Sequence, residues 1–158
     1  MNYQSLAPVV RHGAGCMIMC RVTGRFLMCK RSAITPFPHT WATWGGKAEL
    51  GETPEQTAIR EVFEETGCRI EGEVLHVFHF DMQTFSFHTF LAVVEDEFVP
   101  HINNEAEEAV WMTLEDIPEN VHDGLRATLE DKMTVTRLVK YVENISGRPC
   151  SFDDIYRG

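Results

Sequence analysis

The stretch GKAELGETPEQTAIREVFEETGC, residues 46–68, joins a glycine-containing loop to the best-marked helix of the chain. Thr53 is a favourable N-cap, and Gln56 completes a T-x-x-Q capping box with it. Gly67 can adopt the left-handed conformation in which many helices end. Together these signals predict a helix over residues 53–66.

Three glutamates crowd the second half of this helix. At about 100° per residue they fall opposite a predicted apolar stripe. The stripe is Ala58, Ile59, Val62 and Phe63, and the glutamates are Glu61, Glu64 and Glu65. Each like-charge pair costs roughly 0.2–0.5 kcal/mol, which a solvated acidic face can tolerate. The preceding Gly45-Gly46 and the nearby Glu52 favour a divalent cation instead, because glycine allows close approach and Mg²⁺ prefers oxygen ligands.

The same residues resemble the Nudix box, the signature of the Nudix hydrolase family. Its pattern is G, five residues, E, seven residues, R-E, an aliphatic residue, any residue, E-E, any residue, G and an aliphatic residue. The chain matches at Gly46, Glu52, Arg60, Glu61, Val62, Glu64, Glu65 and Gly67. It departs at Cys68, where an aliphatic residue is usual. TWATWGGK is similar to the W-x-x-P-G-G that often precedes the box, with Trp44 in place of proline, and AVWMTLEDIP is similar to the strand and turn that follow.

The resemblance implies an α/β (α+β) fold, a Nudix-type α/β/α sandwich with a mixed β-sheet and a loop–helix–loop catalytic motif. It also implies a single domain over residues 1–158. The order of strand-like and helix-like stretches agrees with this architecture. The pattern predicts strands at 14–20, 25–30, 73–80, 84–94 and 109–114, helices at 53–66, 121–131 and 133–145, and loops at 31–46 and 95–108.

The resemblance further implies hydrolysis of a nucleoside diphosphate linked to another group, with Mg²⁺ as cofactor and Mn²⁺ able to substitute. By motif position, Glu61 and Glu65 are the main metal ligands, Glu64 is a further ligand, and the Gly45 carbonyl can add another. Arg60 would hold the glutamates by ion pairing, and Glu52 would orient the box or assist with the water. In such a reaction Mg²⁺ neutralises the pyrophosphate and activates a water.

A general base is still needed to take the proton of that water. In many family members it lies on the loop after the central strands, which here reads HINNEAEEAVW. The candidates are Glu105, Glu107 and Glu108, with Glu105 slightly favoured and Glu52 next in order. Each of the three loop acids can equally be a solvated surface charge.

Basic and aromatic side chains near the box are candidates for substrate contacts. Lys30, Arg31 and Lys47 can bind phosphate, with surface charge pairs as the alternative. Trp41 and Trp44 can stack on a base.

The region of the two central strands is rich in aromatic side chains. Its phenylalanines are expected to be mostly core, though one or two could stack a base; they are Phe78, Phe80, Phe85, Phe87 and Phe90. His76 and His79 are expected to point to opposite faces of one strand, because side chains alternate along it. We therefore expect these two and His88 to be core or lining residues, not metal ligands.

Composition limits the class of partner. The 158 residues carry a net charge of −10, which argues against a nucleic-acid polymer or an anionic membrane surface as partner. The five cysteines show no zinc-type spacing and are expected to be buried free thiols. A cytoplasmic protein, monomeric or homodimeric, is the default expectation.

The expected partner is a small nucleotide. A nucleoside triphosphate, oxidised ones included, is favoured because the chain is short and shows no added domain; it would be cleaved to the monophosphate and pyrophosphate. ADP-ribose or another nucleotide sugar is the main alternative. A non-catalytic nucleotide-sensing module is less favoured, because the box retains all its glutamates.

Overall fold

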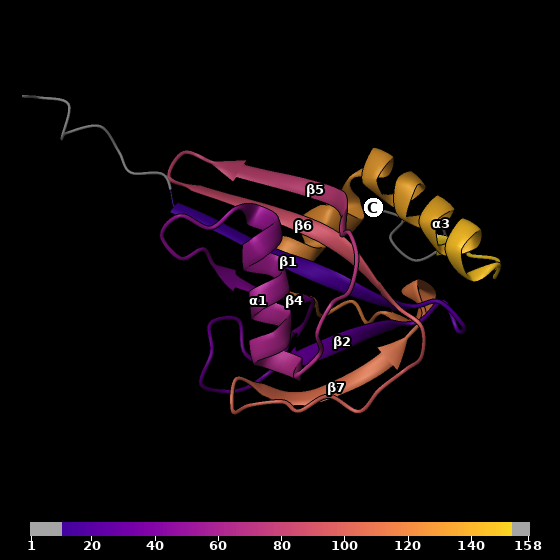
Figure 1. Cartoon of the computed structure of the whole chain (residues 1–158), viewed down its shortest axis with the longest axis horizontal. Helices are drawn as coiled ribbons and strands as arrows, with labels where there is room; N and C mark the ends of the chain where they lie inside the picture. Colours follow the sequence, from indigo (N-terminus) through magenta and orange to yellow (C-terminus); the bar gives the residue numbers. More distant parts are fainter. Residues whose placement is uncertain (1–10, 153–158) are drawn as a thin grey trace, which may run out of the picture.

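The computed structural model describes residues 11–152, which form a mixed β-sheet with helices on both faces (Figure 1). The elements follow the chain in the order β1 (Arg11–Cys20), β2 (Phe26–Arg31), β3 (Trp41–Ala42), β4 (Trp44–Lys47), α1 (Pro54–Thr66), β5 (Leu75–Met82), β6 (Phe85–Val94), β7 (Ala106–Met112), η2 (Leu114–Asp116), α2 (Asp123–Glu130) and α3 (Lys132–Ser146). This architecture confirms the predicted α/β/α sandwich with a mixed sheet.

Strand β1 is the centre of the sheet. It runs parallel to β6 along its whole length, and β5 lies antiparallel on the far side of β6 as an edge strand. On its other side, β1 pairs with β4 through its first half and with β2 through its second half. β2 then continues the sheet to β3 and β7. The loop before α1 is therefore anchored on the central strand.

The helices cover the two faces of the sheet (Figure 1). α1 packs on one face, where Ala58 and Val62 join the apolar side chains of β1 and β6. α2 and α3 pack on the other face, where Leu125 and Leu138 join a second apolar core. Burying one such leucine is worth about 1.5–3 kcal/mol. Each of the two apolar cores therefore stabilises the packing of its helices on the sheet. None of the helices within residues 11–152 has both the length and the apolar character needed to cross a bilayer.

The predicted strands and helices are confirmed, with shifts at their ends, but the two predicted loops are partly wrong. β3 lies within 31–46, β4 begins inside that range, and β7 begins inside 95–108. β4 has the sequence WGGK, and glycine is depleted in strands. Its strand conformation comes from non-local pairing with Gly13–Cys16 of β1. All five cysteines are free thiols, and the burial expected of them is found for Cys16, Cys20 and Cys29 but not for Cys68 and Cys150, which are partly exposed.

Helix α1 is rotated relative to the predicted apolar stripe. Its buried residues are Thr57, Ala58, Val62 and Thr66. Phe63 is 43% exposed and lies beneath the guanidinium of Arg69. The physical reason is the glycine pair of β4: a Cβ at Gly46 would stand 2.6 Å from the carboxyl carbon of Glu61. The glycines leave room for the acidic side of the helix, so the glutamates border the packed face instead of lying opposite it.

Candidate active site

The predicted caps of α1 are present and fix its orientation. The Thr53 side chain accepts a hydrogen bond from the Gln56 backbone N–H (3.2 Å), and the Gln56 side chain accepts one from the Thr53 N–H (2.9 Å). Gly67 ends the helix in the left-handed conformation, with φ 79°. A helix fixed at both ends presents its carboxylates in a defined direction.

Arg60 is the centre of the carboxylate cluster. Its guanidinium donates to Glu52 at 2.7 and 3.0 Å, to Glu61 at 3.0 Å and to Glu64 at 3.1 Å. It also donates to the Lys47 carbonyl at 2.9 Å. The Arg60 hydrogen bonds, assisted by the Glu49 backbone N–H, lower the pKa of Glu52 to about 2. Arg60 is thus directed at the glutamates, which is the geometry that the box resemblance implies.

Glu61 and Glu65 face the glycine pair. The Gly45 N–H donates to Glu65 Oε1 at 2.8 Å. Burial, and next the charge of Glu61, raise the pKa of Glu65 to about 8. Burial also raises the pKa of Glu61, against the opposing effect of Arg60. Because the charged forms of these two carboxylates are disfavoured in the free protein, a nearby divalent cation would stabilise them.

The chemistry of this cluster fits such a cation. Glu61, Glu65 and the Gly45 carbonyl offer the oxygen ligands that Mg²⁺ prefers. Between residues 11 and 152, no three His, Cys, Asp or Glu side chains already form a metal-binding group. The carboxylates would therefore turn inward around the cation, and Glu64, whose side chain is 52% exposed, has room to do so.

A cavity of about 820 Å³ opens beside Glu65. Gly45 and Gly46 border it next to the carboxylate. Four side chains from β5 and β6 form an aromatic wall, namely Phe78, Phe80, Phe85 and Phe87. The volume lies within the roughly 300–1,000 Å³ typical of small-molecule sites. The cavity can therefore hold an aromatic ring on the phenylalanines while a charged group reaches the carboxylates.

The loop between β2 and β3 closes one side of this cavity. Phe37 and His39 have positive φ values of 55° and 61°, which are uncommon for residues with a side chain. The Phe37 ring packs edge-on against His122, with 4.8 Å between ring centroids. His39 Nδ1 lies 2.8 Å from Glu107 Oε1. These contacts hold the loop in a defined shape at the cavity entrance.

The three candidate bases lie in different surroundings. Glu105 lines the cavity, and its charge contributes to the raised pKa values of Glu61 and Glu65. Glu107 is bound to His39, and its carboxylate lies 3.8 Å from the ammonium of Lys30. Glu108 pairs with Lys30 across the backbones of β7 and β2. Of these three acids, Glu105 is the one that lines the cavity.

The phosphate-binding candidates also differ in whether they line the cavity. Arg31 and Lys47 line the cavity. Lys30 lies toward Glu107 instead, as described above. Arg31 also donates from Nε to the Pro36 carbonyl at 2.7 Å, which ties it to the entrance loop.

The two tryptophans do not present free rings to the cavity. Trp41 is half-buried and packs against the core beneath α2 and α3. Trp44 is 1% exposed, and its indole N–H donates to the Leu27 carbonyl at 2.8 Å. The prediction that the Trp44 ring stacks on a base is wrong, because burial leaves it no accessible face.

Several cavity residues were missing from the predicted site. The period-two spacing of Phe78 with Phe80 and of Phe85 with Phe87 places each pair on one strand face. The sequence could therefore have predicted that these phenylalanines form one wall of the cavity. Phe37 and His122 gave no comparable signal. They meet because a loop and the start of α2 come together in the fold.

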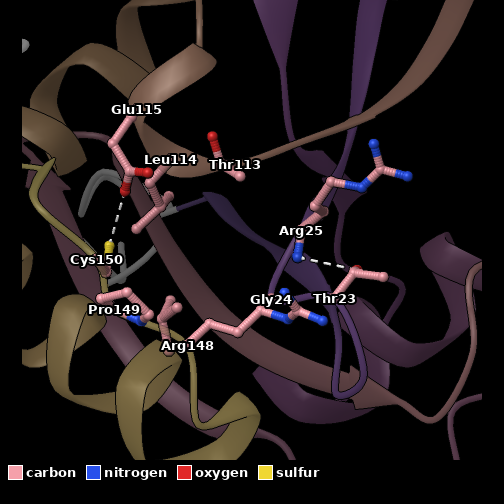
Figure 2. Close-up of a pocket in the computed structure, with 10 residues that line it drawn as sticks. Thr23, Gly24, Arg25, Thr113, Leu114, Glu115, Arg148, Pro149 and Cys150 are labelled. Carbon is pink, nitrogen blue, oxygen red and sulfur yellow. Dashed lines mark hydrogen bonds between the residues drawn. The ribbon is translucent and has the colours of Figure 1, made fainter.

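A smaller cavity of about 470 Å³ lies where β1 turns into β2 (Figure 2). Cys150 donates to Glu115 Oε1 at 3.0 Å across its rim, and Arg148 Nε donates to the Val22 carbonyl at 2.9 Å. Arg25 is bound to Glu97 through two of its nitrogens. These side chains bind other groups of the protein, and none of the predicted site residues lies here.

Comparison with known proteins adds independent information. The family model described as the NUDIX domain matches residues 10–132. The chain is 29% identical over 107 residues to the NAD-capped RNA hydrolase NudC of Photobacterium profundum, covering 63% of this chain and 39% of that protein. It is 41% identical over 58 residues to the nucleoside triphosphatase NudI of Enterobacter sp. (strain 638), covering 34% and 41%.

The chain spans less than half the length of the curated relatives that it matches. Among solved structures, a Nudix hydrolase from M. smegmatis, RenU, superimposes with a TM-score of 0.68 at 22% identity, covering 81% of this chain and 86% of that one. At this identity the likeness supports the fold alone.

Proposed function

This chain belongs to the NUDIX domain family, and from that premise we propose that it is a cation-dependent hydrolase of nucleoside triphosphates, oxidised ones included. The products would be the nucleoside monophosphate and pyrophosphate. We further propose that residues 1–158 act as one domain in the cytoplasm. The similarity to a nucleoside triphosphatase supports the substrate class.

One observation carries the proposal. Glu65 lies half-buried with its pKa raised to about 8, beside a cavity with an aromatic wall. A carboxylate kept from its charged form by burial is a frequent feature of reaction centres. The aromatic wall supplies a place for a nucleobase, and Glu65 lines the same cavity, where the phosphates would lie.

The protein's own groups divide the work of the reaction. Glu61 and Glu65, with Glu64 and the Gly45 carbonyl, would hold the cation, and Arg60 and Glu52 would keep those ligands oriented. When bound, the cation would neutralise charge on the phosphates and polarise the bond that breaks. Glu105 would accept the proton of the attacking water, because it faces the same cavity.

Binding would use both the cationic and the aromatic residues that line the cavity. Arg31 and Lys47 would pair with phosphate oxygens, since charge-assisted hydrogen bonds to phosphate are short and strong. The base would lie against the phenylalanine wall. Phe37 would limit how large a base can enter, because its ring is held at the entrance by His122.

The proposal is tested by a substrate panel. Canonical and oxidised nucleoside triphosphates, ADP-ribose, other nucleotide sugars, NAD and dinucleotide polyphosphates are incubated with the enzyme and Mg²⁺, and products are separated by chromatography. We expect monophosphate and pyrophosphate from triphosphates at the highest kcat/KM. A higher kcat/KM for ADP-ribose or NAD would reassign the substrate class, and no turnover of any compound with Mg²⁺ or Mn²⁺ would refute the hydrolase.

A further inference from the structure

Three histidines gather on the face of the sheet that carries α1, away from the phenylalanine wall. His88 lies on β6, and His76 and His79 lie on β5, which runs beside it at the sheet edge (Figure 1). The sequence predicts that His76 and His79 point to opposite faces, and this prediction is wrong. A bulge between His76 and Phe78 inserts one extra residue, so the alternation is reset and both rings turn toward His88.

The closest approach is between His76 and His88. His76 Nε2 and His88 Nδ1 share a hydrogen bond at 3.2 Å, whose hydrogen a metal ion bound by both nitrogens would displace. Two imidazole nitrogens that share one metal ion at 2.0–2.1 Å stand about 2.9–3.4 Å apart for bond angles between square-planar and tetrahedral values. The two rings therefore already stand at a chelating distance.

Neighbouring side chains hold both rings in place. His79 stacks flat on His88, with 4.1 Å between centroids and 7° between planes, and its own Nε2 lies 2.7 Å from the hydroxyl of the buried Ser86. His76 packs edge-on against Phe90, with centroids 5.5 Å apart. Ordered rings lose little conformational entropy when they bind a ligand.

We propose that His76 and His88 form a chelating site for a borderline divalent transition-metal ion of the class of Ni²⁺, Zn²⁺ or Cu²⁺. Imidazole suits these ions, whereas Mg²⁺ prefers oxygen ligands. Within residues 11–152 no third His, Cys, Asp or Glu side chain completes the group, so water fills the remaining positions. His79 acts as a packing partner and not as a ligand.

The surroundings of the two rings keep them uncharged. Burial lowers the pKa of His76 and of His88, so both rings are neutral at pH 7.5 and able to coordinate. Arg137 and His79 also disfavour a charged His76, as His79 does a charged His88, and Glu55, in the first turn of α1, acts in the opposite direction on both rings. Glu55 precedes the helical glutamates of the carboxylate cluster by six to ten residues, which is about 9–15 Å of helix. The histidine pair lies on β5 and β6 and shares no residue with that cluster.

The test is a Ni²⁺ titration of tag-free protein in excess Mg²⁺, which occupies the carboxylates. Histidine side chains are followed in long-range ¹H–¹⁵N NMR spectra, and stoichiometry is measured by calorimetry. We expect one Ni²⁺ per chain and selective broadening of the His76 and His88 signals. His76→Gln and His88→Gln should each weaken binding more than about tenfold, since even the loss of an outer partner of a metal ligand costs that much.

Two matched variants complete the design. His101→Gln changes an exposed histidine on the loop before β7 and should bind as the wild type does. His79→Phe keeps an aromatic ring for stacking and should also bind. Equal Ni²⁺ affinity in wild type, His76→Gln and His88→Gln would overturn the proposal, as would saturable binding that only His79→Phe abolishes. Melting curves without metal identify any variant that is unfolded, and His76→Asn or His88→Asn then replaces it.

Discussion

Replacing Arg60 with methionine should destabilise the protein strongly, because it removes the positive charge that lies within 4 Å of the carboxylates of Glu49, Glu52, Glu61 and Glu64. Methionine reproduces the arginine side chain as far as the position of Nε and keeps the packing of the stem, so the loss of stability reports the guanidinium. The Arg60 side chain is 21% exposed, so its ion pairs are intermediate between fully buried and fully exposed ones. Losing one partner of a buried pair costs about 3–5 kcal/mol and a surface pair about 0–1 kcal/mol. We therefore expect a loss of about 2–4 kcal/mol, which lowers Tm by roughly 5–15 °C for a domain of this size.

The pH dependence gives the prediction its sharpest form. Arg60 holds the pKa of Glu52 at about 2, below its ordinary value of 4.5. A lowered carboxyl pKa contributes stability that is present above the ordinary pKa and is lost as pH falls toward the folded one. The difference in Tm between wild type and Arg60→Met should therefore be full at pH 7 and shrink steadily between pH 4.5 and about 2.

Arg25→Met is the matched control. Arg25 also donates two hydrogen bonds to one carboxylate, that of Glu97, but its side chain is 44% exposed. We expect a loss of no more than about 1 kcal/mol. Thermal melts followed by circular dichroism measure both variants. An Arg60→Met protein that melts no lower than Arg25→Met, or whose deficit does not shrink in acid, would refute the role given to Arg60.

Three further outcomes are expected. Glu65→Gln should lower kcat by roughly 10²-fold or more while the protein stays folded. Because the pKa of Glu65 is raised to about 8, its charge lowers the stability of the wild type increasingly from pH 4.5 to above 8. In EDTA the variant should therefore have the Tm of the wild type near pH 4.5 and a higher Tm at pH 9, and an unfolded or fully active variant contradicts this. Glu105→Gln should reduce kcat strongly and leave the Mg²⁺ affinity nearly unchanged, whereas Glu107→Gln and Glu108→Gln should be milder; the reverse order in turnover assays would move the base within the loop. Excess EDTA should abolish turnover, and turnover that persists in EDTA would exclude a cation requirement. Mildly alkaline pH should favour turnover.

The sequence was informative where local physics decides the structure. Thr53, Gln56 and Gly67 predicted both ends of α1, because caps depend on residues within one helical turn. The spacing of Arg60 and the glutamates predicted their clustering for the same reason. The apolar strands and the two C-terminal helices also followed from periodicity.

Non-local contacts decided what the sequence did not predict. Gly45 and Gly46 form a strand because β1 supplies the partner, and no propensity within WGGK indicates this. Trp44 is buried for a related reason, since its indole meets the Leu27 carbonyl of another strand. Phe37 and His122 come from distant segments, and the bulge that turns His76 toward His88 depends on the register of two strands.

That bulge has a further consequence for the behaviour of the protein at high concentration. β5 is an edge strand, and its sequence LHVFHFDM is rich in aromatic and apolar residues. A straight edge of this kind exposes backbone groups to which a strand of another molecule can add, which is how ordered aggregates begin. The extra residue at Val77 bends the edge and interrupts the regular spacing of its backbone donors and acceptors. The irregularity should therefore help to keep neighbouring molecules apart in solution.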